Sequence, residues 1–394
     1  MENLPIVHVV NGRQKKLLQG HPWVYGNEIE RVEGEIEDGG LVTVVDFRGR
    51  YMGTGFYNSK SLITVRLLTH RQEEITDKLI ASRVKAACDY RRFVMNRPGT
   101  DSCRLIYGEA DRLPGVIADR FGGVIVLQVL ALGMERFTQT IADALLACEK
   151  PDCLLLQNDD AIRRKEGMEC FTRVLYGTLP EENIIHENGV KLAVDVLGGQ
   201  KTGYFLDQKD NHLFVRQFCK DARVLDCFSY IGAFALNAAA AGAKEVTAVD
   251  ISEAAVQLIE KNAALNGADI TAVCANCFDF LRAQVKAGEK YDVVVLDPPA
   301  FTKAHANMAS ACRGYKEIAL SAMRLLPAGG VLATHSCSYH MPEEVFVNTV
   351  LSAAQDLHRQ VRVITLRRQD IDHPVLAGYP ESHYLKSLWL QMLD

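Results

Sequence analysis

The chain has 394 residues, of which 48% are hydrophobic and 24% charged, and its formal net charge is −5. This length exceeds what one hydrophobic core usually supports, so two or three domains are expected. The acidic balance excludes a protein that binds nucleic acid through its overall charge, and any such contact has to come from a local basic patch.

The sequence predicts a cytoplasmic protein. Residues 1–5 (MENLP) are not a basic region followed by an apolar stretch, so no signal peptide is expected, and no apolar run is long enough to span a membrane. The 11 cysteines are an odd number and are typical of free thiols in a reducing compartment. Cys274 and Cys277 have CxxC spacing, but no second pair accompanies them, so no metal site is expected.

Residues 1–71 are predicted to form a small β-barrel. Two strand-like runs, 41–46 (LVTVVD) and 62–66 (LITVR), are separated by several glycines. Lys15 and Lys16 stand near the start of this unit and could belong to a basic face that contacts RNA. A solvated surface of mixed charge explains the same lysines about as well.

Residues 72–188 are predicted to form a small central α/β domain. A helix is expected over 77–94, where apolar residues recur at helical spacing, and a second helix is expected near 134–146. Strands are expected at 124–130 (VIVLQVL) and 153–157 (CLLLQ), one before and one after the second helix.

In residues 189–394, strands and helices alternate strictly from residue 222 onward. One helix is predicted to begin after Ser252 as its N-cap and to end at 266–267 (NG). This alternation predicts an α/β fold with a doubly wound parallel sheet, whose ligands bind at the carboxyl ends of the strands. Five strands are expected, at 223–226, 245–249, 271–275, 291–296 and 331–334.

Acidic residues at the ends of the first two of these strands predict a cofactor that contains adenosine. The first strand ends at Asp226 and leads to Gly232 and an Ala-rich helix, and the second ends at Asp250, followed by Ile251. A carboxylate at the end of the second strand can accept hydrogen bonds from ribose hydroxyls. This feature is shared by sites for NAD and for S-adenosylmethionine.

The turn after the first strand distinguishes these two cofactors. A dinucleotide needs three glycines so that the backbone can approach a pyrophosphate, but only Gly232 is present, and Phe228 and Tyr230 are bulky. S-adenosylmethionine has no pyrophosphate and carries an ammonium and a sulfonium, which suit the carboxylate of Asp226. Asp279, after the third strand, is placed to accept a hydrogen bond from the adenine amino group. S-adenosylmethionine is therefore the predicted cofactor.

The segment after the fourth strand is predicted to hold a planar base. It reads LDPPAF (296–301), and Asp297 completes a series in which an aspartate follows each of four successive strands. That series predicts a methyltransferase. Asp297 offers a carboxylate, and Pro298, Pro299 and Phe301 offer a stiff apolar surface for the substrate.

Cys337, just past the fifth strand, favours methylation of a pyrimidine carbon. A thiolate that attacks C6 of cytosine makes C5 nucleophilic, while Asp297 would bind N4 and N3 and stabilise the charge that develops in the ring. The rival chemistry for an Asp-Pro-Pro segment is amino methylation, which needs no cysteine. A cysteine near a strand end is more often a buried small hydrophobe, but the polar neighbours Ser336 and Ser338 argue against burial. His335 could share a strand face with the thiol and lower its pKa.

Seven segments together resemble the large-subunit ribosomal RNA cytosine-5 methyltransferase I family, and the resemblance covers nearly the whole chain. They are 108–115 (GEADRLPG), 200–208 (QKTGYFLDQ), 226–232 (DCFSYIG), 296–301 (LDPPAF), 311–316 (ACRGYK), 336–338 (SCS) and 372–376 (DHPVL).

The resemblance implies an N-terminal PUA-type RNA-binding barrel, a central α/β domain and a Rossmann-like catalytic domain. It implies 5-methylation of one cytidine in 23S ribosomal RNA with Cys337 as the nucleophile, and it implies that Phe205 and Gln208 help enclose the cofactor. Other RNA cytosine-5 methyltransferases carry a second cysteine directly after the proline of the Asp-Pro segment, where this chain has Pro299-Ala300. Another base must therefore complete the cycle.

Two alternatives remain open at this point. Members of the wider group also methylate guanine, so the target could be a guanine or another RNA base. A protein that keeps the fold but only binds RNA, such as a ribosome assembly factor, is a hypothesis of a different class. A homodimer is a further expectation, and no membrane partner is expected.

Overall fold

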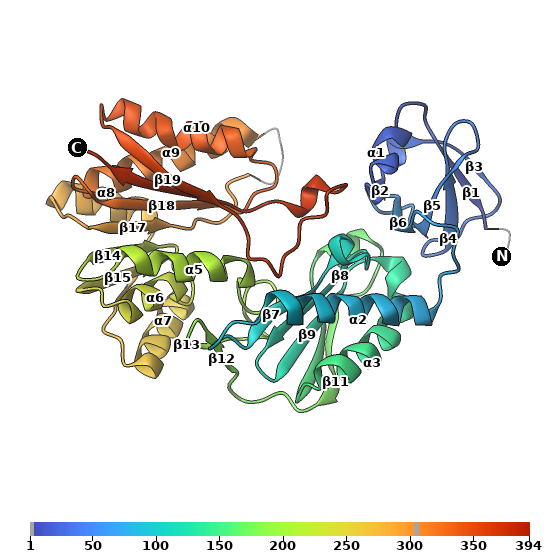
Figure 1. Ribbon diagram of the computed structural model, residues 1–394, viewed down its shortest axis with the longest axis horizontal. Coiled ribbons are helices and arrows are strands. Elements are labelled where there is room, and N and C mark those ends of the chain that lie inside the picture. Colours follow the sequence, from blue (N-terminus) through green and yellow to red (C-terminus); the bar gives the residue numbers. More distant parts are fainter. Residues whose placement is uncertain (1–3, 303–306) are drawn as a thin grey trace.

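The computed structural model describes residues 4–302 and 307–394. Within these ranges the chain forms sheets of six, five and seven strands and a two-stranded hairpin. The six-stranded and seven-stranded sheets lie at opposite sides of Figure 1, and the five-stranded sheet lies between and below them. No helix among the described residues is long and apolar enough to cross a membrane.

The N-terminal unit is a six-stranded sheet in the order β2-β6-β5-β4-β1-β3, in which β1 and β4 are parallel and the other neighbours are antiparallel. The predicted strand at 62–66 is shifted, because the strand begins only at Val65 and Leu62 is 87% exposed. The elements are β1 (Ile6–Val9), α1 (Gln14–Leu18), β2 (Trp23–Val24), η1 (Gly26–Glu28), β3 (Ile29–Glu33), β4 (Leu41–Val45), β5 (Tyr51–Tyr57) and β6 (Val65–Thr69).

Glycines allow β5 and β6 to approach each other closely. A Cβ at Gly55 would lie 2.2 Å from the carbonyl oxygen of Arg66, and a Cβ at Gly53 would lie 2.6 Å from that of Thr69. Both oxygens belong to backbone, which cannot move aside without breaking the pairing of the two strands. The glycines of this unit therefore have a packing role in the sheet as well as a role in turns.

The central unit is a five-stranded sheet in the order β11-β10-β9-β8-β7. The helix predicted over 77–94 is present with those bounds and is capped by Thr76, whereas the helix expected near 134–146 is divided into η3 and a longer α3. The elements are α2 (Asp77–Val94), β7 (Ser102–Tyr107), η2 (Gly108–Asp111), β8 (Val116–Phe121), β9 (Val124–Val129), η3 (Leu132–Phe137), α3 (Thr138–Glu149), β10 (Cys153–Asn158), α4 (Ile162–Lys165) and β11 (Phe171–Gly177).

The C-terminal unit is a seven-stranded sheet in the order β16-β15-β14-β17-β18-β20-β19. The five predicted strands are parallel, and two strands that were not predicted extend the sheet beyond β18: β20, which is antiparallel to both of its neighbours, and then β19. The strands are β14 (Arg223–Cys227), β15 (Glu245–Asp250), β16 (Thr271–Cys274), β17 (Val293–Leu296), β18 (Val331–Ser336), β19 (Val361–Arg367) and β20 (Lys386–Met392).

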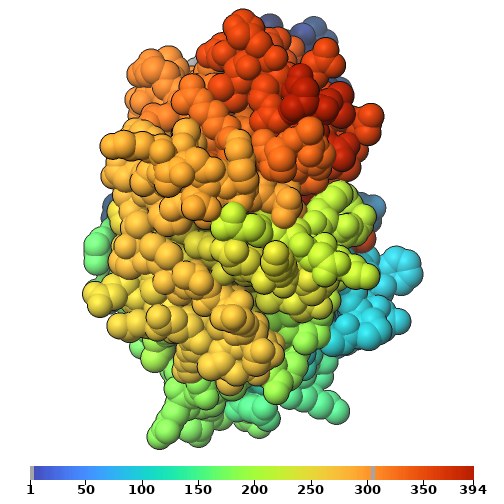
Figure 2. All heavy atoms as spheres, turned by 90° about the vertical axis from the view of Figure 1, so that its left-hand side faces the viewer, coloured from blue at the N-terminus to red at the C-terminus, as the bar shows by residue number. Residues whose placement is uncertain are grey.

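Helices cover both faces of this sheet, and the hairpin β12–β13 precedes it. Seen from the side of Figure 1 that lies opposite the N-terminal unit, the surface is formed mainly by this C-terminal unit, and almost nothing of the N-terminal unit is visible (Figure 2). The remaining elements are β12 (Ile184–Glu187), β13 (Val190–Ala193), η4 (Leu206–Gln208), α5 (Lys209–Val215), η5 (Arg216–Phe218), α6 (Ala233–Ala240), α7 (Glu253–Asn266), α8 (Cys277–Ala287), α9 (Met308–Leu325), α10 (Glu343–Asp356) and η7 (Pro380–Ser382).

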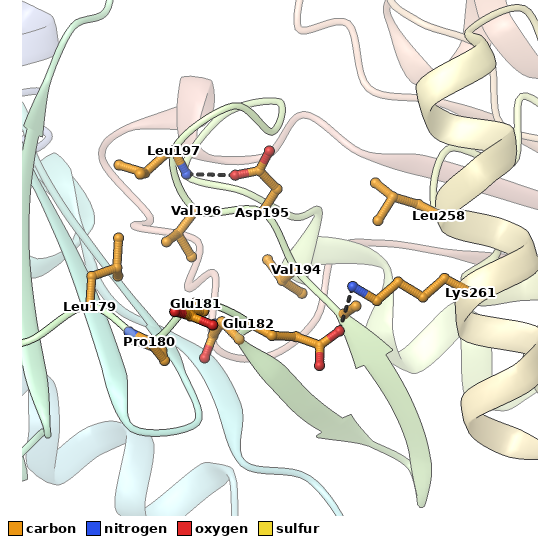
Figure 3. A pocket seen from close by; sticks show the side chains of 12 residues that line it. Leu179, Pro180, Glu181, Glu182, Val194, Asp195, Val196, Leu197, Leu258 and Lys261 are labelled. Carbon is orange, nitrogen blue, oxygen red and sulfur yellow. Dashed lines mark hydrogen bonds and ion pairs between the residues drawn. The ribbon is translucent and has the colours of Figure 1, made fainter.

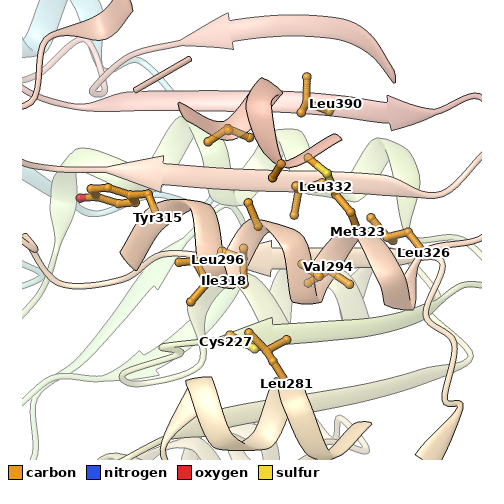
Figure 4. Packing of buried hydrophobic residues seen from close by; sticks show 14 of the residues in the cluster. Cys227, Leu281, Val294, Leu296, Tyr315, Ile318, Met323, Leu326, Leu332 and Leu390 are labelled. Carbon is orange, nitrogen blue, oxygen red and sulfur yellow. The ribbon is translucent and has the colours of Figure 1, made fainter. Parts of the chain in front are cut away.

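A continuous apolar core fixes the carboxyl ends of the central strands. On one face of the sheet, side chains of β17, β18 and β20, including Leu296, Leu332 and Leu390, pack against α9, which contributes Tyr315 and Ile318 (Figure 4). Burial of such side chains is the main favourable term in folding, at about 1.5–3 kcal/mol each. Because both sides of β17 and β18 are packed, the segments that follow them leave the sheet at fixed positions.

The loop between β19 and β20, residues 368–385, connects all three units. Asp370 accepts two hydrogen bonds from Arg97 of the central unit, at 2.8 and 3.0 Å. Further along the loop, Glu381 contacts His21 at 3.2 Å, and the ring of Tyr379 lies 4.8 Å from that of Trp23 in the N-terminal unit. This β19–β20 loop is the C-terminal segment that extends from the seven-stranded sheet toward the N-terminal unit in Figure 1.

Candidate active site

The turn between β14 and α6 forms the first wall of the site. Phe228, Tyr230 and Gly232 have φ angles of 64°, 50° and 85°, so alternate residues of the turn are left-handed. The chain therefore keeps a glycine-type turn with two bulky residues in it, a strained conformation of the kind that is concentrated at functional sites. The two rings stand where a pyrophosphate would need open backbone.

Asp226 lies at the base of this turn and is fully buried. Its Oδ2 accepts a hydrogen bond from the backbone N–H of Ala235 at 3.2 Å, whereas Oδ1 has no partner among the described residues. Burial, to which the nearby Asp297 adds, raises the pKa of Asp226 to about 7. A buried carboxylate oxygen without a donor fits a cationic group such as the ammonium of S-adenosylmethionine.

Asp250, at the end of β15, holds the turn in place. Its two oxygens accept hydrogen bonds from the backbone N–H groups of Tyr230 and Ser252, each at 2.9 Å. The next residue, Ile251, is 68% exposed. An exposed aliphatic side chain beside a fixed carboxylate suits the base and ribose of an adenosine.

Asp279 stands in the first turn of α8, after the N-cap Asn276. Its carboxylate is exposed and forms an ion pair with Arg282 at 2.6 Å. The structure therefore places Asp279 at the sheet edge with a partner already in contact, and an adenine amino group would have to share its oxygens with Arg282.

Gln208 connects the cofactor side of the site to Asp297. Its Nε2 donates a hydrogen bond to Asp297 Oδ2 at 3.0 Å, and its Oε1 accepts one from Asn211 at 2.6 Å. The amide is thus held from both ends. Phe205, at the start of the same segment, packs edge-on against Tyr230 with ring centroids 5.3 Å apart.

Asp297 follows β17, the strand next to β14. Burial, and then the neighbouring Asp207, raises the pKa of Asp297 to about 7. Near neutral pH this carboxyl is therefore both an acid and a base, so it can donate a hydrogen bond to a ring nitrogen and accept one from an amino group.

The segment after Asp297 forms an apolar wall. Pro298 is buried, Pro299 is exposed, and the half-buried ring of Phe301 lies 4.7 Å from Tyr315 and 5.8 Å from Phe278. Four residues that follow, 303–306, lie outside the described part of the chain.

Cys337 follows β18, directly beside that wall. The Oγ of Ser338 donates a hydrogen bond to the carbonyl of Thr302 at 2.7 Å, which ties the loop carrying the thiol to the segment carrying Asp297. Cys337 is only partly exposed, and burial, together with the charge of Asp297, raises the pKa of its thiol to about 11.

The suggestion that His335 lowers the pKa of the thiol was wrong, and the serines that flank Cys337 are buried although Cys337 itself is partly exposed. Ser336 and Ser338 are buried despite their polarity, because Ser336 Oγ accepts a hydrogen bond from Tyr315 at 2.9 Å and Ser338 bonds to Thr302. His335 is fully buried between Phe234 and Trp389, and burial lowers its pKa to about 3. A neutral, packed imidazole cannot stabilise the thiolate.

The structure adds a polar cluster that the sequence analysis did not assign. The ammonium of Lys201 lies 4.3 Å from the centre of the Phe205 ring and 3.2 Å from Asp207, which also accepts a hydrogen bond from Tyr384. Burial alone would raise the pKa of Asp207, but Lys201, His373 and the hydrogen bond from Tyr384 together outweigh it and hold the pKa well below its ordinary value. Lys201 and Asp207 both belong to the segment QKTGYFLDQ, but the sequence alone did not indicate that they face Asp297.

Lys15 and Lys16 lie in α1 of the N-terminal unit and are not equivalent. Lys15 is exposed. Lys16 forms an ion pair with Glu28 at 2.6 Å and lies over the ring of Tyr25 at 4.5 Å. A phosphate contact from Lys16 would have to compete with a buried carboxylate.

A cavity of about 150 Å³ between the hairpin β12–β13 and α7 is distinct from this site (Figure 3). Lys261 of α7 pairs with Glu182, and Asp195 accepts a hydrogen bond from the backbone N–H of Leu197 at 3.0 Å. Its described lining includes none of the aspartates at the strand ends. Among the residues that the structure describes, no group of three or more His, Cys, Asp or Glu side chains is arranged to hold a metal ion.

Two family models match the chain. Residues 7–70 match the PUA-like domain, and residues 125–369, more than half of the chain, match the S-adenosylmethionine-dependent methyltransferase family. The second range contains the turn after β14, Asp297 and Cys337.

Curated relatives are similar to the chain along nearly all of its length. "Ribosomal RNA large subunit methyltransferase I" of Klebsiella pneumoniae (strain 342) is 42% identical over 388 residues, which is 97% of each chain. The protein of the same name from Salmonella arizonae is 41% identical over 390 residues, covering 98% of this chain and 96% of the relative.

Solved structures share the whole arrangement. A putative S-adenosylmethionine-dependent methyltransferase from Streptococcus mutans superposes with a TM-score of 0.84 at 20% identity, covering 98% of this chain and 99% of its own. A putative methyltransferase complexed with S-adenosylhomocysteine gives the same TM-score, identity and coverage. The predicted fold class, a Rossmann-like α/β domain behind a PUA-like N-terminal domain, is confirmed.

Proposed function

Because the chain belongs to the large-subunit ribosomal RNA methyltransferase I family, we propose that it methylates C5 of a cytosine in 23S ribosomal RNA. Its predicted reaction class and cofactor, methyl transfer from S-adenosylmethionine, are confirmed by the family. The observation that carries the cytosine proposal is the juxtaposition of Cys337 and Asp297 on neighbouring strand ends, joined by the hydrogen bond from Ser338 to Thr302.

The cofactor is proposed to lie over the turn after β14. Asp226 would receive its ammonium, Asp250 its ribose, and Ile251, Phe205 and the turn itself its apolar parts. Asp279 is proposed to contact the adenine amino group at the rim. Bound there, S-adenosylmethionine supplies an electrophilic methyl group, and the chain's own residues prepare the base to receive it.

The target base is proposed to enter between the Asp297 segment and Cys337. Pro298, Pro299 and Phe301 would line its plane, and Asp297 would bind N4 and N3, held in orientation by Gln208. The Cys337 thiolate attacks C6, and the electron pair displaced toward C5 makes that carbon nucleophilic. After methylation, loss of the C5 proton restores the C5=C6 double bond and expels the thiolate.

RNA recognition is proposed to involve the PUA-like domain, with Lys15 in contact with phosphates.

We also propose a cytoplasmic location, a homodimer that light scattering would reveal, and domain boundaries at 71/72 and 188/189. The first boundary lies between the end of β6 and the start of α2, and the second lies in the turn of the hairpin β12–β13.

Replacing the nucleophile tests the function most directly. Cys337→Ala is expected to abolish transfer of labelled methyl groups to unmodified 23S RNA, while S-adenosylmethionine binding stays within about twofold of wild type, because Cys337 is proposed to contact only the base. The exposed Cys274 provides a matched control, Cys274→Ala, which should retain turnover.

The nature of the product decides between the alternatives. Mapping should place the label at C5 of a cytidine, and RNA containing 5-fluorocytidine should form a covalent adduct with wild type but not with the Cys337 variant. Label on guanine, on another base or on an exocyclic amine would overturn the proposal. RNA binding without any transfer would assign the chain to ribosome assembly instead.

A further inference from the structure

A buried lysine lies on the strand next to the thiol. Lys386 begins β20 and is paired directly with Ser336, the last residue of β18. It is 3% exposed, and its ammonium donates hydrogen bonds to the carbonyl of Ser338 at 2.5 Å and to that of Tyr384 at 2.7 Å. Lys386 is therefore paired with the residue before Cys337 and bound to the carbonyl of the residue after it.

Within the described ranges, no carboxylate forms an ion pair with this ammonium. Lys209, also buried, has Asp372 at 2.5 Å, whereas Lys386 contacts two neutral carbonyls. The acidic groups that act on Lys386 through space are Cys337 and Glu343, and burial lowers the pKa of Lys386 to about 8. Glu343 lies 3.9 Å from Arg368 and 3.9 Å from His383, so its charge is already shared. A buried cation of this kind needs an anion.

The remaining charged groups around Cys337 do not supply a free cation. Asp297 and Asp207 both raise the pKa of the thiol, and Lys201, which lowers it, is paired with Asp207 at 3.2 Å. Tyr315 faces the sulfur from α9 as a neutral phenol whose pKa burial raises to about 12. Among the described groups around the loop that carries the thiol, Lys386 is the buried cation with no carboxylate in ion-pair contact, and Glu343 acts on it only through space.

We propose that the Lys386 ammonium is the counter-charge of the Cys337 thiolate and keeps that anion available for attack on the base. The inference rests on the proposed role of Cys337 as nucleophile and deepens it. On activation the S–H bond breaks, the proton leaves to solvent, the electron pair stays on Sγ, and the nitrogen keeps its protons. That pair then forms the S–C6 bond and returns to sulfur when the C5=C6 bond is restored. Lys386 gives no proton to the substrate and acts, in its protonated form, as a positioning residue.

The pH profile of thiol alkylation tests this pairing. Iodoacetamide is reacted with the full-length protein over about pH 6 to 12, a range that includes the raised pKa of the Cys337 thiol, and labelling is followed at each cysteine by mass spectrometry. Lys386→Met is expected to slow alkylation of Cys337 at least tenfold at pH 8 and to move the midpoint of its profile to higher pH, because the thiolate loses its counter-charge. Exposed Cys274 serves as the internal reference and should not change.

Three further measurements separate charge from structure. Lys386→Arg should restore most of the wild-type profile, and Lys290→Met, at the opposite end of the sheet where Lys290 donates to the carbonyl of Arg324, should have no effect. Loss of a purely structural contact would change the rate at every pH without moving the midpoint. Lys386→Gln keeps a donor for the Ser338 carbonyl and replaces the Met variant if that variant does not bind S-adenosylmethionine.

An unchanged midpoint in a Met or Gln variant that still binds cofactor would overturn the inference. The measurement needs no RNA, so its result is independent of the target base. If the midpoint moves but RNA is labelled at a guanine, the proposed function fails and the ion pair stands. If 5-fluorocytidine RNA forms its adduct while the midpoint does not move, the proposed function stands and the ion pair with Lys386 fails.

Discussion

Asp297 combines burial with a second polar contact, and the two together determine what it can do. Burial and Asp207 raise its pKa to about 7, while the amide of Gln208 binds one of its oxygens. The other oxygen is left for the base that we propose Asp297 binds, and the carboxyl is protonated in a large fraction of molecules at neutral pH. From sequence, Asp297 was predicted to be a base-binding carboxylate, but its protonation follows from the surroundings that the fold creates.

This protonation predicts a falling limb in the pH profile of methyl transfer. The protonated fraction of Asp297 declines as the pH rises through about 7, and with it declines the hydrogen bond that Asp297 donates to N3 of cytosine. Asp297→Asn presents a donor and an acceptor at every pH, so we expect a rate lowered roughly tenfold but without this decline. Single-turnover rates between about pH 6 and 9 provide the measurement. The same falling limb in the Asn variant would show that another group causes it.

At the scale of elements, η4 and α5 position the site through contacts with the β19–β20 loop. Lys209, the first residue of α5, is buried against Asp372 at 2.5 Å. Burial alone would raise the pKa of Asp372, but Lys209 and then His373 outweigh it and hold the pKa well below its ordinary value. This buried pair fixes the segment that also carries Gln208 and Phe205, so its stability bears directly on the geometry at Asp297.

Breaking that pair from one side is expected to be costly. Lys209→Met leaves Asp372 buried without its cation and should lower the free energy of unfolding by about 3–5 kcal/mol. The double variant Lys209→Met/Asp372→Asn removes both charges and should lose less than the single variant. Chemical denaturation of the three proteins measures the difference. Equal losses in the single and double variants would show that the uncompensated charge is not the cause.

At the scale of the whole molecule, the β19–β20 loop joins the PUA-like N-terminal unit to the methyltransferase unit of an acidic protein. Its contacts with His21 and Trp23 bring the N-terminal unit against the same loop that holds α5. The net charge of −5 repels a polyanion overall, so binding depends on where the cations lie. Lys15 is free to contact phosphate, whereas Lys16 is occupied by Glu28.

Charge reversal should therefore separate the two lysines. Lys15→Glu is expected to weaken RNA affinity several-fold at low salt and to reduce its salt dependence, because one phosphate contact and its released counterion are lost. Lys16→Glu places a second carboxylate against Glu28 and should instead lower the unfolding temperature of the protein. Fluorescence anisotropy with a labelled 23S fragment and thermal unfolding distinguish the two effects. Equal loss of affinity without any loss of stability would contradict the assignment of Lys16.

Prediction from sequence succeeded where local pattern and chemistry coincide. The helix over 77–94 and the parallel strands from β14 to β18 follow from hydrophobic periodicity, caps and glycines, which act within a few residues. The strand β20 was missed, because a fully packed strand near a chain end shows no alternation to mark it. The position of Lys386 was missed as well, since Lys386 is the first residue of β20.

The sequence by itself determined the reaction class and the cofactor, because the aspartates that follow successive parallel strands must meet at one edge of the sheet. It also placed Cys337 at that edge. Only the tertiary structure decided the environment of each group: buried serines beside the thiol, a neutral His335, Gln208 bound to Asp297, and Lys386 bound to the carbonyl of Ser338, the residue after Cys337. The physical reason is that burial and through-space charge depend on residues far apart in the chain, and these properties set the protonation on which the chemistry depends.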